Sequence, residues 1–204
     1  MDLIGLLDSP YVRRVAISLT LLGVPFRHRA LSVFRDYAEF KTINPVVKAP
    51  TLVCDDGEII IDSTLILDHI EGLIDPAASL MPAGSQRQHA LHAIGLALAA
   101  CEKTAQIAYE RNLRPAEKQH QPWLDRVSEQ LTAAYDLLET AVAARSGPWL
   151  CADRPLQPDI TVAVAWGFTQ YVIAGEIDAS RYPALSAFAA QAEALPVFQA
   201  IPIA

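Results

Sequence analysis

The sequence predicts two successive parts, an α/β part followed by an all-helical part. Through residues 1–75, short apolar runs alternate with helix-like segments, whereas no strand-like segment follows residue 85. Between them lies a stretch rich in Pro, Ala, Gly and Ser that has no sustained period. Apolar residues make up 52% and charged residues 19% of the chain, which indicates a well-packed protein and excludes a disordered one.

The α/β part begins with a short apolar run, residues 3–7, which predicts a strand. Residues 9–23 follow with apolar side chains at helical spacing, and Gly23 provides the stop signal. Residues 26–31 alternate in the manner of a half-buried strand. A weaker helix is predicted over residues 36–43.

Two further strands are expected on either side of Asp56-Gly57, a pair of residues that strongly favours a hairpin turn. A helix over residues 62–73 closes the unit, with Ser63 as its expected N-cap. The resulting order, β-α-β-α-β-β-α, is the thioredoxin-like arrangement. We therefore expect a thioredoxin-like N-terminal domain over residues 1–75.

Residues 76–84 are expected to form a linker, and residues 85–204 an all-α C-terminal helical bundle. Long helical stretches cover 85–112 and 117–146. The second stretch has one apolar face, made of Trp123, Val127, Leu131, Ala134, Leu138 and Val142. Two shorter helices follow, the first of them apolar and beginning near Asp159.

Charge and hydropathy limit the possible partners and location. The net charge of −7 argues against nucleic acid as a partner. No apolar run reaches the roughly 18 residues that a membrane span requires, and no basic leader is present at the N-terminus. We therefore expect a cytoplasmic protein that does not bind or span a membrane.

The charge is unevenly distributed along the chain. Residues 1–50 hold seven Lys and Arg against four Asp and Glu, whereas the remainder holds nine against nineteen. A small anionic ligand would therefore find its positive groups near the N-terminus.

Cysteine and histidine residues do not suggest a metal site. Cys54, Cys101 and Cys151 are odd in number and far apart, so we expect buried thiols outside any disulfide framework or zinc site. His89 and His92 are three residues apart, but no third ligand is apparent. We therefore expect no metal.

Ser9 and Val12 occupy the positions at which a thiol–disulfide protein carries the two cysteines of Cys-Pro-Tyr-Cys. Two interpretations of Ser9 remain open. It either only caps the helix, or it donates a hydrogen bond to a ligand thiolate at a helix start that Arg13 and Arg14 make electropositive. One charge-assisted hydrogen bond contributes about 1.5–3 kcal/mol, enough to lower a thiol pKa by about one to two units.

A second candidate segment surrounds Pro50. A proline at the entrance of a strand leaves the amide and carbonyl of Ala49 facing outward, where an extended peptide could pair with them. A cis Ala49–Pro50 bond would hold that edge open, although only about 5% of X-Pro bonds are cis. Lys48 beside it is either a carboxylate ligand or a solvated lysine.

The third candidate segment contains Asp62 and Ser63, at a strand-to-helix junction where backbone donors and the helix dipole favour a carboxylate. Ser63 offers a further donor, and Asp62 an acceptor for an ammonium group. An amino-acid headgroup matches this pair. An ordinary helix cap is the alternative.

Taken together, the segments SPYVRRV, NPVVKAPTLV and DST resemble the glutathione transferase family, and the resemblance covers nearly the whole chain. It implies a thioredoxin-like domain that binds glutathione, a helical domain that supplies most of the electrophile site, and a homodimer. The SPYV segment is similar to that of bacterial and plant-type members in which this serine, here Ser9, activates the glutathione thiol.

The same resemblance implies the roles of the other candidate residues. Lys48 would contact the glycyl end of glutathione, Ala49 the cysteinyl backbone before a cis Pro50, and Asp62 with Ser63 the γ-glutamyl group.

This sequence departs from the family pattern at two places. Asp62 is shorter than the glutamate that the family usually carries there. In the second domain, the family's Ser/Thr-x-x-Asp capping box becomes the segment 156–159, in which only Asp159 is kept.

The sequence therefore predicts a cytoplasmic, homodimeric glutathione S-transferase with a role in detoxification. Glutathione would be the cosubstrate, no metal would be needed, and the thiolate would attack a small hydrophobic electrophile. Two alternatives remain: a glutathione-dependent peroxidase, dehalogenase or isomerase on the same site, or a non-catalytic glutathione transferase-like binding protein.

Overall fold

The computed structural model describes residues 1–203, and the chain divides into two compact units. The first unit contains residues 1–80 together with the residues from Leu195 onward, and the second unit contains residues 81–194. The last residues of the sequence therefore belong to the first unit, although they follow the second one along the chain.

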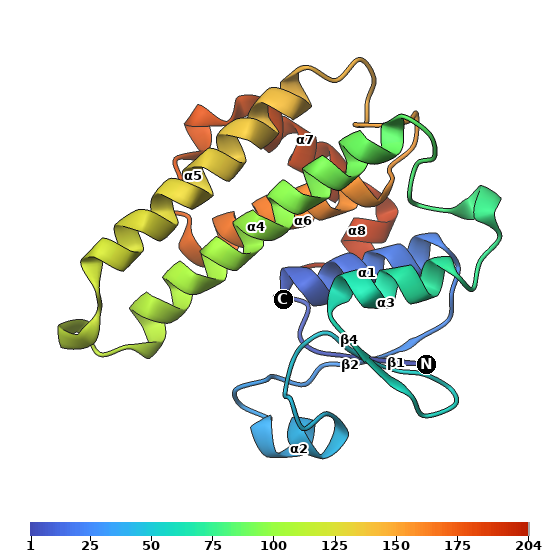
Figure 1. The fold of residues 1–204 in the computed structure, drawn as a ribbon, viewed down its shortest axis with the longest axis horizontal. Helices are drawn as coiled ribbons and strands as arrows, with labels where there is room; N and C mark the ends of the chain where they lie inside the picture. The colour runs from blue at the N-terminus through green and yellow to red at the C-terminus, as the bar shows by residue number, and fades with distance from the viewer. Residues whose placement is uncertain (204) are drawn as a thin grey trace. The chain divides into compact units, whose positions relative to one another are not determined.

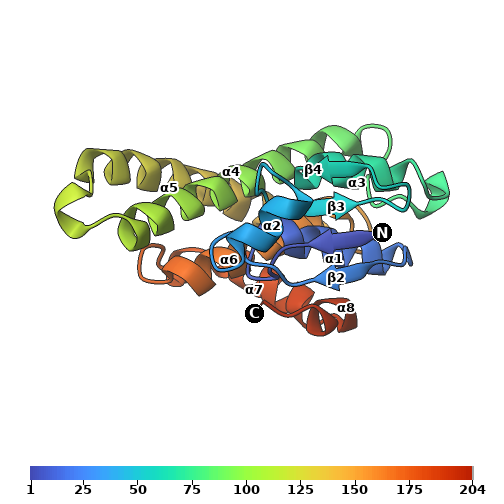
Figure 2. The ribbon, with the colours of Figure 1, turned by 90° about the horizontal axis from the view of Figure 1, so that it is seen from below.

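A mixed sheet forms the centre of the first unit, with the strand order β2-β1-β3-β4. Its strands are β1 (Asp2–Ile4), β2 (Arg27–Arg29), β3 (Thr51–Val53) and β4 (Ile59–Ile61). β1 runs parallel to β2 and antiparallel to β3, so that Leu3 lies opposite both His28 and Leu52. Figure 2 shows β2, β1 and β3 side by side. Because β1 and β2 are parallel, the chain must cross over between them, and a helix makes that crossover.

The helices of the first unit lie on both sides of this sheet. They are α1 (Pro10–Leu21), α2 (Tyr37–Ile43), α3 (Ser63–Glu71) and α8 (Pro196–Ala200), with a short 3₁₀ turn at Pro76–Ala78. Helices α1 and α3 pack against each other on one side, and α2 lies on the opposite side (Figure 1). The predicted thioredoxin-like order of strands and helices is confirmed.

Helix α8 was not expected from the sequence, because five residues are too few to show a helical period. It is joined to α1 by a buried arginine. Arg13 Nε donates to the carbonyl oxygen of Ile201 at 2.9 Å, and its guanidinium lies 5.5 Å from the ring centroid of Phe198. The sequence suggested that Arg13 would add positive charge at the start of α1, whereas the structure places its guanidinium against the tail.

The second unit contains only helices among its described residues, which confirms the predicted all-α part. They are α4 (Gln86–Leu113), α5 (Gln121–Ala143), α6 (Gln157–Ile173) and α7 (Pro183–Glu193), with 3₁₀ turns at Ala116–Lys118 and Ala179–Arg181. Helix α4 packs against α5 and α6, and α7 packs against α5 and α6. The rings of Tyr135, Trp166 and Tyr182 meet in the core at centroid distances of 5.0–6.0 Å.

One residue predicted to lie on the apolar face of α5, Trp123, does not belong to that face, so the prediction is wrong there. Trp123 is 41% exposed, whereas Leu124 is 4% exposed and takes its place in the core. Leu124 lies seven residues before Leu131, and this spacing brings it nearer the centre of the buried stripe. The other five predicted residues are buried. Among residues 1–203, no helix is both long and apolar enough to cross a membrane.

The start of α6 is held by one carboxylate, as the retained aspartate of the capping box suggests. Asp159 accepts hydrogen bonds from the backbone N–H groups of Leu150 and Leu156, each at 2.8 Å. Burial raises the pKa of Asp159 to about 6, although these hydrogen bonds act in the opposite direction.

Candidate functional site

Ser9 is the N-cap of α1, with extended backbone angles, and Pro10 is the first helical residue. The Ser9 carbonyl accepts the N–H of Arg13 at 2.9 Å, so the backbone closes the first turn. Within the described chain, the Ser9 side chain makes no capping hydrogen bond. Its hydroxyl is therefore not one of the groups that hold the helix start.

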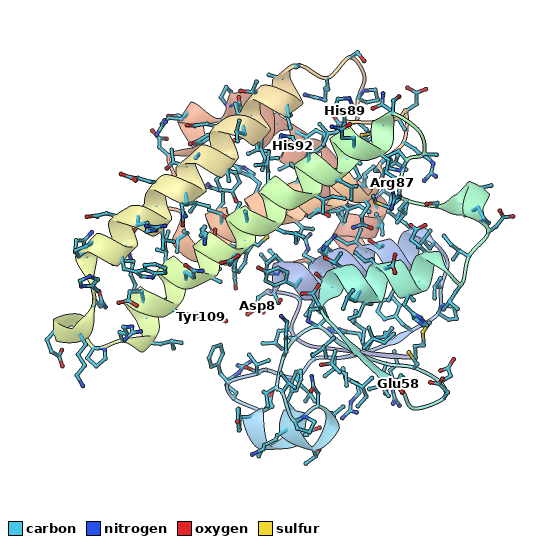
Figure 3. All side chains as sticks on the ribbon, in the orientation of Figure 1. Asp8, Glu58, Arg87, His89, His92 and Tyr109 are labelled. Atoms are coloured by element: carbon cyan, nitrogen blue, oxygen red, sulfur yellow. The ribbon has the colours of Figure 1, made fainter. Side chains whose placement is uncertain are left out.

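Asp8 precedes Ser9 at the same end of α1 (Figure 3). Burial raises the pKa of the Asp8 carboxyl, and the backbone N–H of Ser9 and the charge of Arg35 offset part of that effect. The helix start thus combines one carboxyl group with the positive end of a helix dipole.

Gly5 allows the first turn of α1 to approach the segment that contains Ala49. Gly5 has a φ of 139°, and a Cβ atom there would lie 2.5 Å from Val12 Cγ2 and 3.0 Å from Ala49 Cβ. Only glycine accommodates both this backbone angle and this close approach. The peptide bond between Ala49 and Pro50 is cis.

Two buried polar residues, Asn44 and Thr51, fix the backbone of the Ala49 segment through hydrogen bonds. Asn44 Nδ2 donates to Thr51 Oγ1 at 2.8 Å, and Thr51 Oγ1 donates to the carbonyl of Lys48 at 2.7 Å. Asn44 Oδ1 also accepts the N–H of Val46 at 3.0 Å. Neither Asn44 nor Thr51 is among the site residues predicted from the sequence. Asn44 could have been predicted as a turn residue, because an asparagine side chain often accepts a hydrogen bond from the backbone N–H two residues further on.

Lys48 and Asp62 bring the Ala49 segment close to the start of α3. Lys48 Nζ lies 3.7 Å from Asp62 Oδ2, and both side chains are about half exposed. An exposed pair of this kind contributes at most about 1 kcal/mol, so it orients the two groups more than it stabilises the fold.

Asp62 is the N-cap of α3, so the expectation that Ser63 caps this helix is wrong. Asp62 has a φ of 75°, and its Oδ1 accepts the N–H of Thr64 at 2.9 Å. The carboxylate reaches the second helical amide, which makes Ser63 the first helical residue.

The hydroxyl of Ser63 meets a buried arginine from α1. Arg14 Nη1 donates to Ser63 Oγ at 3.1 Å and to Thr64 Oγ1 at 3.4 Å. Arg14 and Ser63 are each 2% exposed. The sequence indicated Arg14 as part of the positive field around Ser9, whereas the structure directs its guanidinium to the start of α3.

The three candidate segments are thus linked within the first unit. Gly5 joins the turn after Ser9 to the Ala49 segment, Lys48 joins that segment to Asp62, and Arg14 joins α1 to Ser63. The linked groups are a hydroxyl at a helix start, the backbone before a cis proline at the start of β3, and a carboxylate–hydroxyl pair. Their chemistry suits a thiol peptide that carries an amino-acid headgroup.

The other residues considered from the sequence lie outside this linked set. None of Cys54, Cys101 and Cys151 forms a disulfide within residues 1–203, and burial raises the pKa of the Cys54 thiol. His89 and His92 lie on the first turns of α4 (Figure 3). No group of three or more potential metal ligands was found in the described part of the chain.

The comparison with protein families matches both units. Residues 3–77 match the model of the glutathione S-transferase N-terminal domain, and residues 121–190 match that of the glutathione S-transferase C-terminal domain. The chain belongs to the glutathione S-transferase family.

Two relatives illustrate the range of sequences to which it is similar. An uncharacterized GST-like protein of Escherichia coli is 27% identical over 139 residues, which cover 68% of this chain and 68% of that protein. A probable maleylacetoacetate isomerase of Vibrio cholerae is 25% identical over 217 residues, covering 98% of this chain and 94% of that protein.

Two solved structures are also similar. A glutathione S-transferase from Methylobacterium radiotolerans in complex with glutathione sulfonate is 26% identical, with a TM-score of 0.89 over 100% of this chain and 95% of that one. A glutathione transferase family member from Pseudomonas fluorescens with bound glutathione is also 26% identical. Its TM-score is 0.81, and the match covers 98% of this chain and 97% of the other.

Proposed function

We propose that this protein is a glutathione transferase that ionises the glutathione thiol at Ser9 and conjugates it to a small hydrophobic electrophile. The observation that carries the proposal is that the Ser9 hydroxyl stands at the start of α1 without capping it, among the described residues. The relatives solved with glutathione or glutathione sulfonate support the choice of ligand.

The other candidate residues are proposed to hold the peptide. Lys48 would bind the glycyl carboxylate, and the Ala49 backbone beside Pro50 would pair with the cysteinyl residue. Asp62 and Ser63 would take the ammonium and carboxylate of the γ-glutamyl group. The hydrogen bonds from Asn44 and Thr51 support this arrangement, because they fix the backbone that has to pair with the peptide.

In the proposed reaction, the thiol proton leaves to solvent and the thiolate accepts a hydrogen bond from Ser9 Oγ. The thiolate sulfur then forms a bond to an electrophilic carbon, and the displaced group leaves with the bonding electron pair. A hydrogen bond of about 1.5–3 kcal/mol to the thiolate would lower its pKa by about one to two units, so that much of it is ionised at neutral pH.

Ser9→Ala tests the role of the hydroxyl. We expect conjugation of a model aryl halide, measured as kcat/KM, to fall about 10- to 100-fold while the Kd for glutathione changes little. The pH at which the rate reaches half its plateau should rise by one to two units.

Ser9→Thr serves as the matched control, since it keeps a hydroxyl at the same position and should retain most of the activity. Unchanged activity in Ser9→Ala would remove Ser9 from the mechanism. Binding of glutathione without turnover of any electrophile would instead favour a non-catalytic binding protein.

Glutathione-dependent isomerisation is the second candidate, favoured by the similarity to the probable isomerase of Vibrio cholerae over 98% of this chain. Here the thiolate adds to the substrate and leaves again after a bond has rotated. The consumption of glutathione separates the reactions. Conjugation or dehalogenation consumes glutathione, peroxide reduction converts it to its disulfide, and isomerisation returns it unchanged.

We also propose that the protein works as a cytoplasmic homodimer in detoxification. Membership of the glutathione S-transferase family supports the homodimer. Light scattering coupled to gel filtration measures the mass directly, and a mass of one chain at micromolar concentration would contradict the dimer.

A further inference from the structure

We propose that Arg14 is a positioning residue for the carboxylate-binding end of the site, acting through the hydroxyl of Ser63. The inference rests on the proposed function and extends it to a residue that binds no ligand atom itself. It arises from one contact, the 3.1 Å hydrogen bond from Arg14 Nη1 to Ser63 Oγ.

The direction of this hydrogen bond is determined by chemistry. A guanidinium carries only donors, so Ser63 Oγ has to be the acceptor. A serine hydroxyl has one hydrogen and accepts through two lone pairs, and the arginine occupies one of these. The hydroxyl hydrogen is therefore turned away from the guanidinium and is oriented as a donor toward a different acceptor.

The surroundings of Ser63 favour an anionic acceptor. Ser63 is the first residue of α3, where the backbone amides and the helix dipole stabilise negative charge. The neighbouring amide of Thr64 is already occupied by the carboxylate of Asp62. The Ser63 hydroxyl then adds a donor at the position proposed for the γ-glutamyl carboxylate.

The burial of Arg14 makes its position well defined. Its exposed fraction is 2%, and its second contact, to Thr64 Oγ1 at 3.4 Å, holds the guanidinium across the first turn of α3. A buried guanidinium with two contacts on one turn has little rotational freedom.

Arg14→Met keeps most of the side-chain volume and removes the donors, so it tests the proposal. We expect the Kd for glutathione, measured by titration calorimetry, to rise about 10-fold, with kcat at saturating glutathione changing less than about 3-fold. Arg14→Lys keeps the charge but loses the planar pair of donors, and it should restore part of the affinity.

Two glutathione analogues distinguish positioning from a general structural role. Glutaryl-cysteinyl-glycine keeps the carboxylate of the headgroup and lacks the amine, whereas 4-aminobutyryl-cysteinyl-glycine keeps the amine and lacks that carboxylate. The effect of Arg14→Met should persist with the glutaryl analogue and disappear with the aminobutyryl analogue. Equal weakening of both analogues would overturn the proposal.

A double-mutant cycle with Ser63→Ala provides the second test. If Arg14 acts through Ser63, Arg14→Lys should weaken glutathione binding in the wild-type background and change it less than about 2-fold in the Ser63→Ala background. Independent, additive effects would contradict the inference. This arm uses the lysine variant, so it remains decisive even if Arg14→Met does not fold.

The outcomes also separate this inference from the proposed function. If the wild-type chain does not bind glutathione, both are wrong. If it binds glutathione and the Arg14 variants do not discriminate between the analogues, only the role of Arg14 is wrong.

Discussion

At the scale of single residues, Gly5 is a position where the candidate site has no room for a side chain. A methyl group there would meet Val12 Cγ2 at 2.5 Å and Ala49 Cβ at 3.0 Å, on a backbone with φ 139°. The clash would push the Ala49 segment away from the first turn of α1, which carries Ser9 at its start.

Gly5→Ala should therefore lower both stability and glutathione affinity. Overpacking and an unfavourable φ together cost about 2–4 kcal/mol of the free energy of unfolding, measurable by urea denaturation. Gly23→Ala is the control, because Gly23 also has a positive φ (65°) and a Cβ there meets nothing within 4 Å. A loss in Gly5→Ala no larger than in the control would show that the close approach is unimportant.

Val47 carries backbone strain immediately before Lys48. Its φ of 51° lies in the left-handed region, which a β-branched side chain rarely adopts. Its N–H is bonded to the carbonyl of Asn44 at 2.9 Å, so the turn holds the residue in this conformation.

Val47→Gly should stabilise the protein. Relief of about 1–3 kcal/mol of strain exceeds the roughly 0.5–1 kcal/mol that glycine loses through the greater entropy of the unfolded chain. We expect the free energy of unfolding to rise by about 1 kcal/mol, with an increased midpoint in urea. A decrease in the midpoint would mean that the turn does not strain Val47.

At the scale of elements, the cap of α6 makes stability depend on pH. The pKa of Asp159 is raised by burial from 3.8 to about 6, so the folded chain binds a proton more tightly than the unfolded chain. The favourable contribution of this proton is complete below pH 3.8 and is lost as the pH rises through about 6. The full difference corresponds to about 3 kcal/mol.

Asp159→Asn removes this titration and keeps an oxygen that can accept a backbone N–H. The stability difference, wild type minus variant, should fall by up to about 3 kcal/mol between about pH 4 and pH 7 and then stay constant. Denaturation of both proteins across that range measures it. A difference independent of pH would show that Asp159 has an ordinary pKa.

Helices and strands that are marked by turn residues or by a clear hydrophobic period could be predicted from the sequence, whereas elements without such a mark could not. The strands around Asp56-Gly57 and the long helices carried clear turn or periodicity signals. Helix α8 did not, since a single turn has no period. The cap of α3 was assigned one residue late because Asp62 and Ser63 are both good caps, and only the observed hydrogen bond to Thr64 distinguishes them.

The candidate site shows the same division. Ser9, Lys48 and Asp62 could be proposed from the sequence because Ser9 and Asp62 stand at helix starts and Lys48 lies two residues before a proline, where local chemistry is informative. Asn44 and Arg14 make their hydrogen bonds with residues 7 and 49 positions away. The contact of Arg14 depends on the packing of α1 against α3, which one sequence does not reveal.

At the scale of the whole molecule, the first unit is completed by residues from the far end of the sequence. Phe198 is 1% exposed and lies against the guanidinium of Arg13, which also binds the carbonyl of Ile201. Loss of this ring leaves a cavity beside a buried charge.

Phe198→Ala should cost about 3–5 kcal/mol of the free energy of unfolding. Because α8 belongs to the first unit, hydrogen exchange should accelerate in α1 before it does in α4. Leu137→Ala, which truncates a half-exposed side chain of the second unit, is the control and should have little effect. Faster exchange in α4 alone would show that α8 does not support the first unit.

The placement of α8 also has a consequence for synthesis on the ribosome. The chain emerges from its N-terminus, so α1 and the sheet are exposed long before Phe198 and Ile201 are made. The whole of residues 81–194 must be translated in between. The first unit, although it begins first along the chain, can therefore reach its finished packing only after residues 81–194 have been synthesised, because Arg13 contacts Phe198 and Ile201.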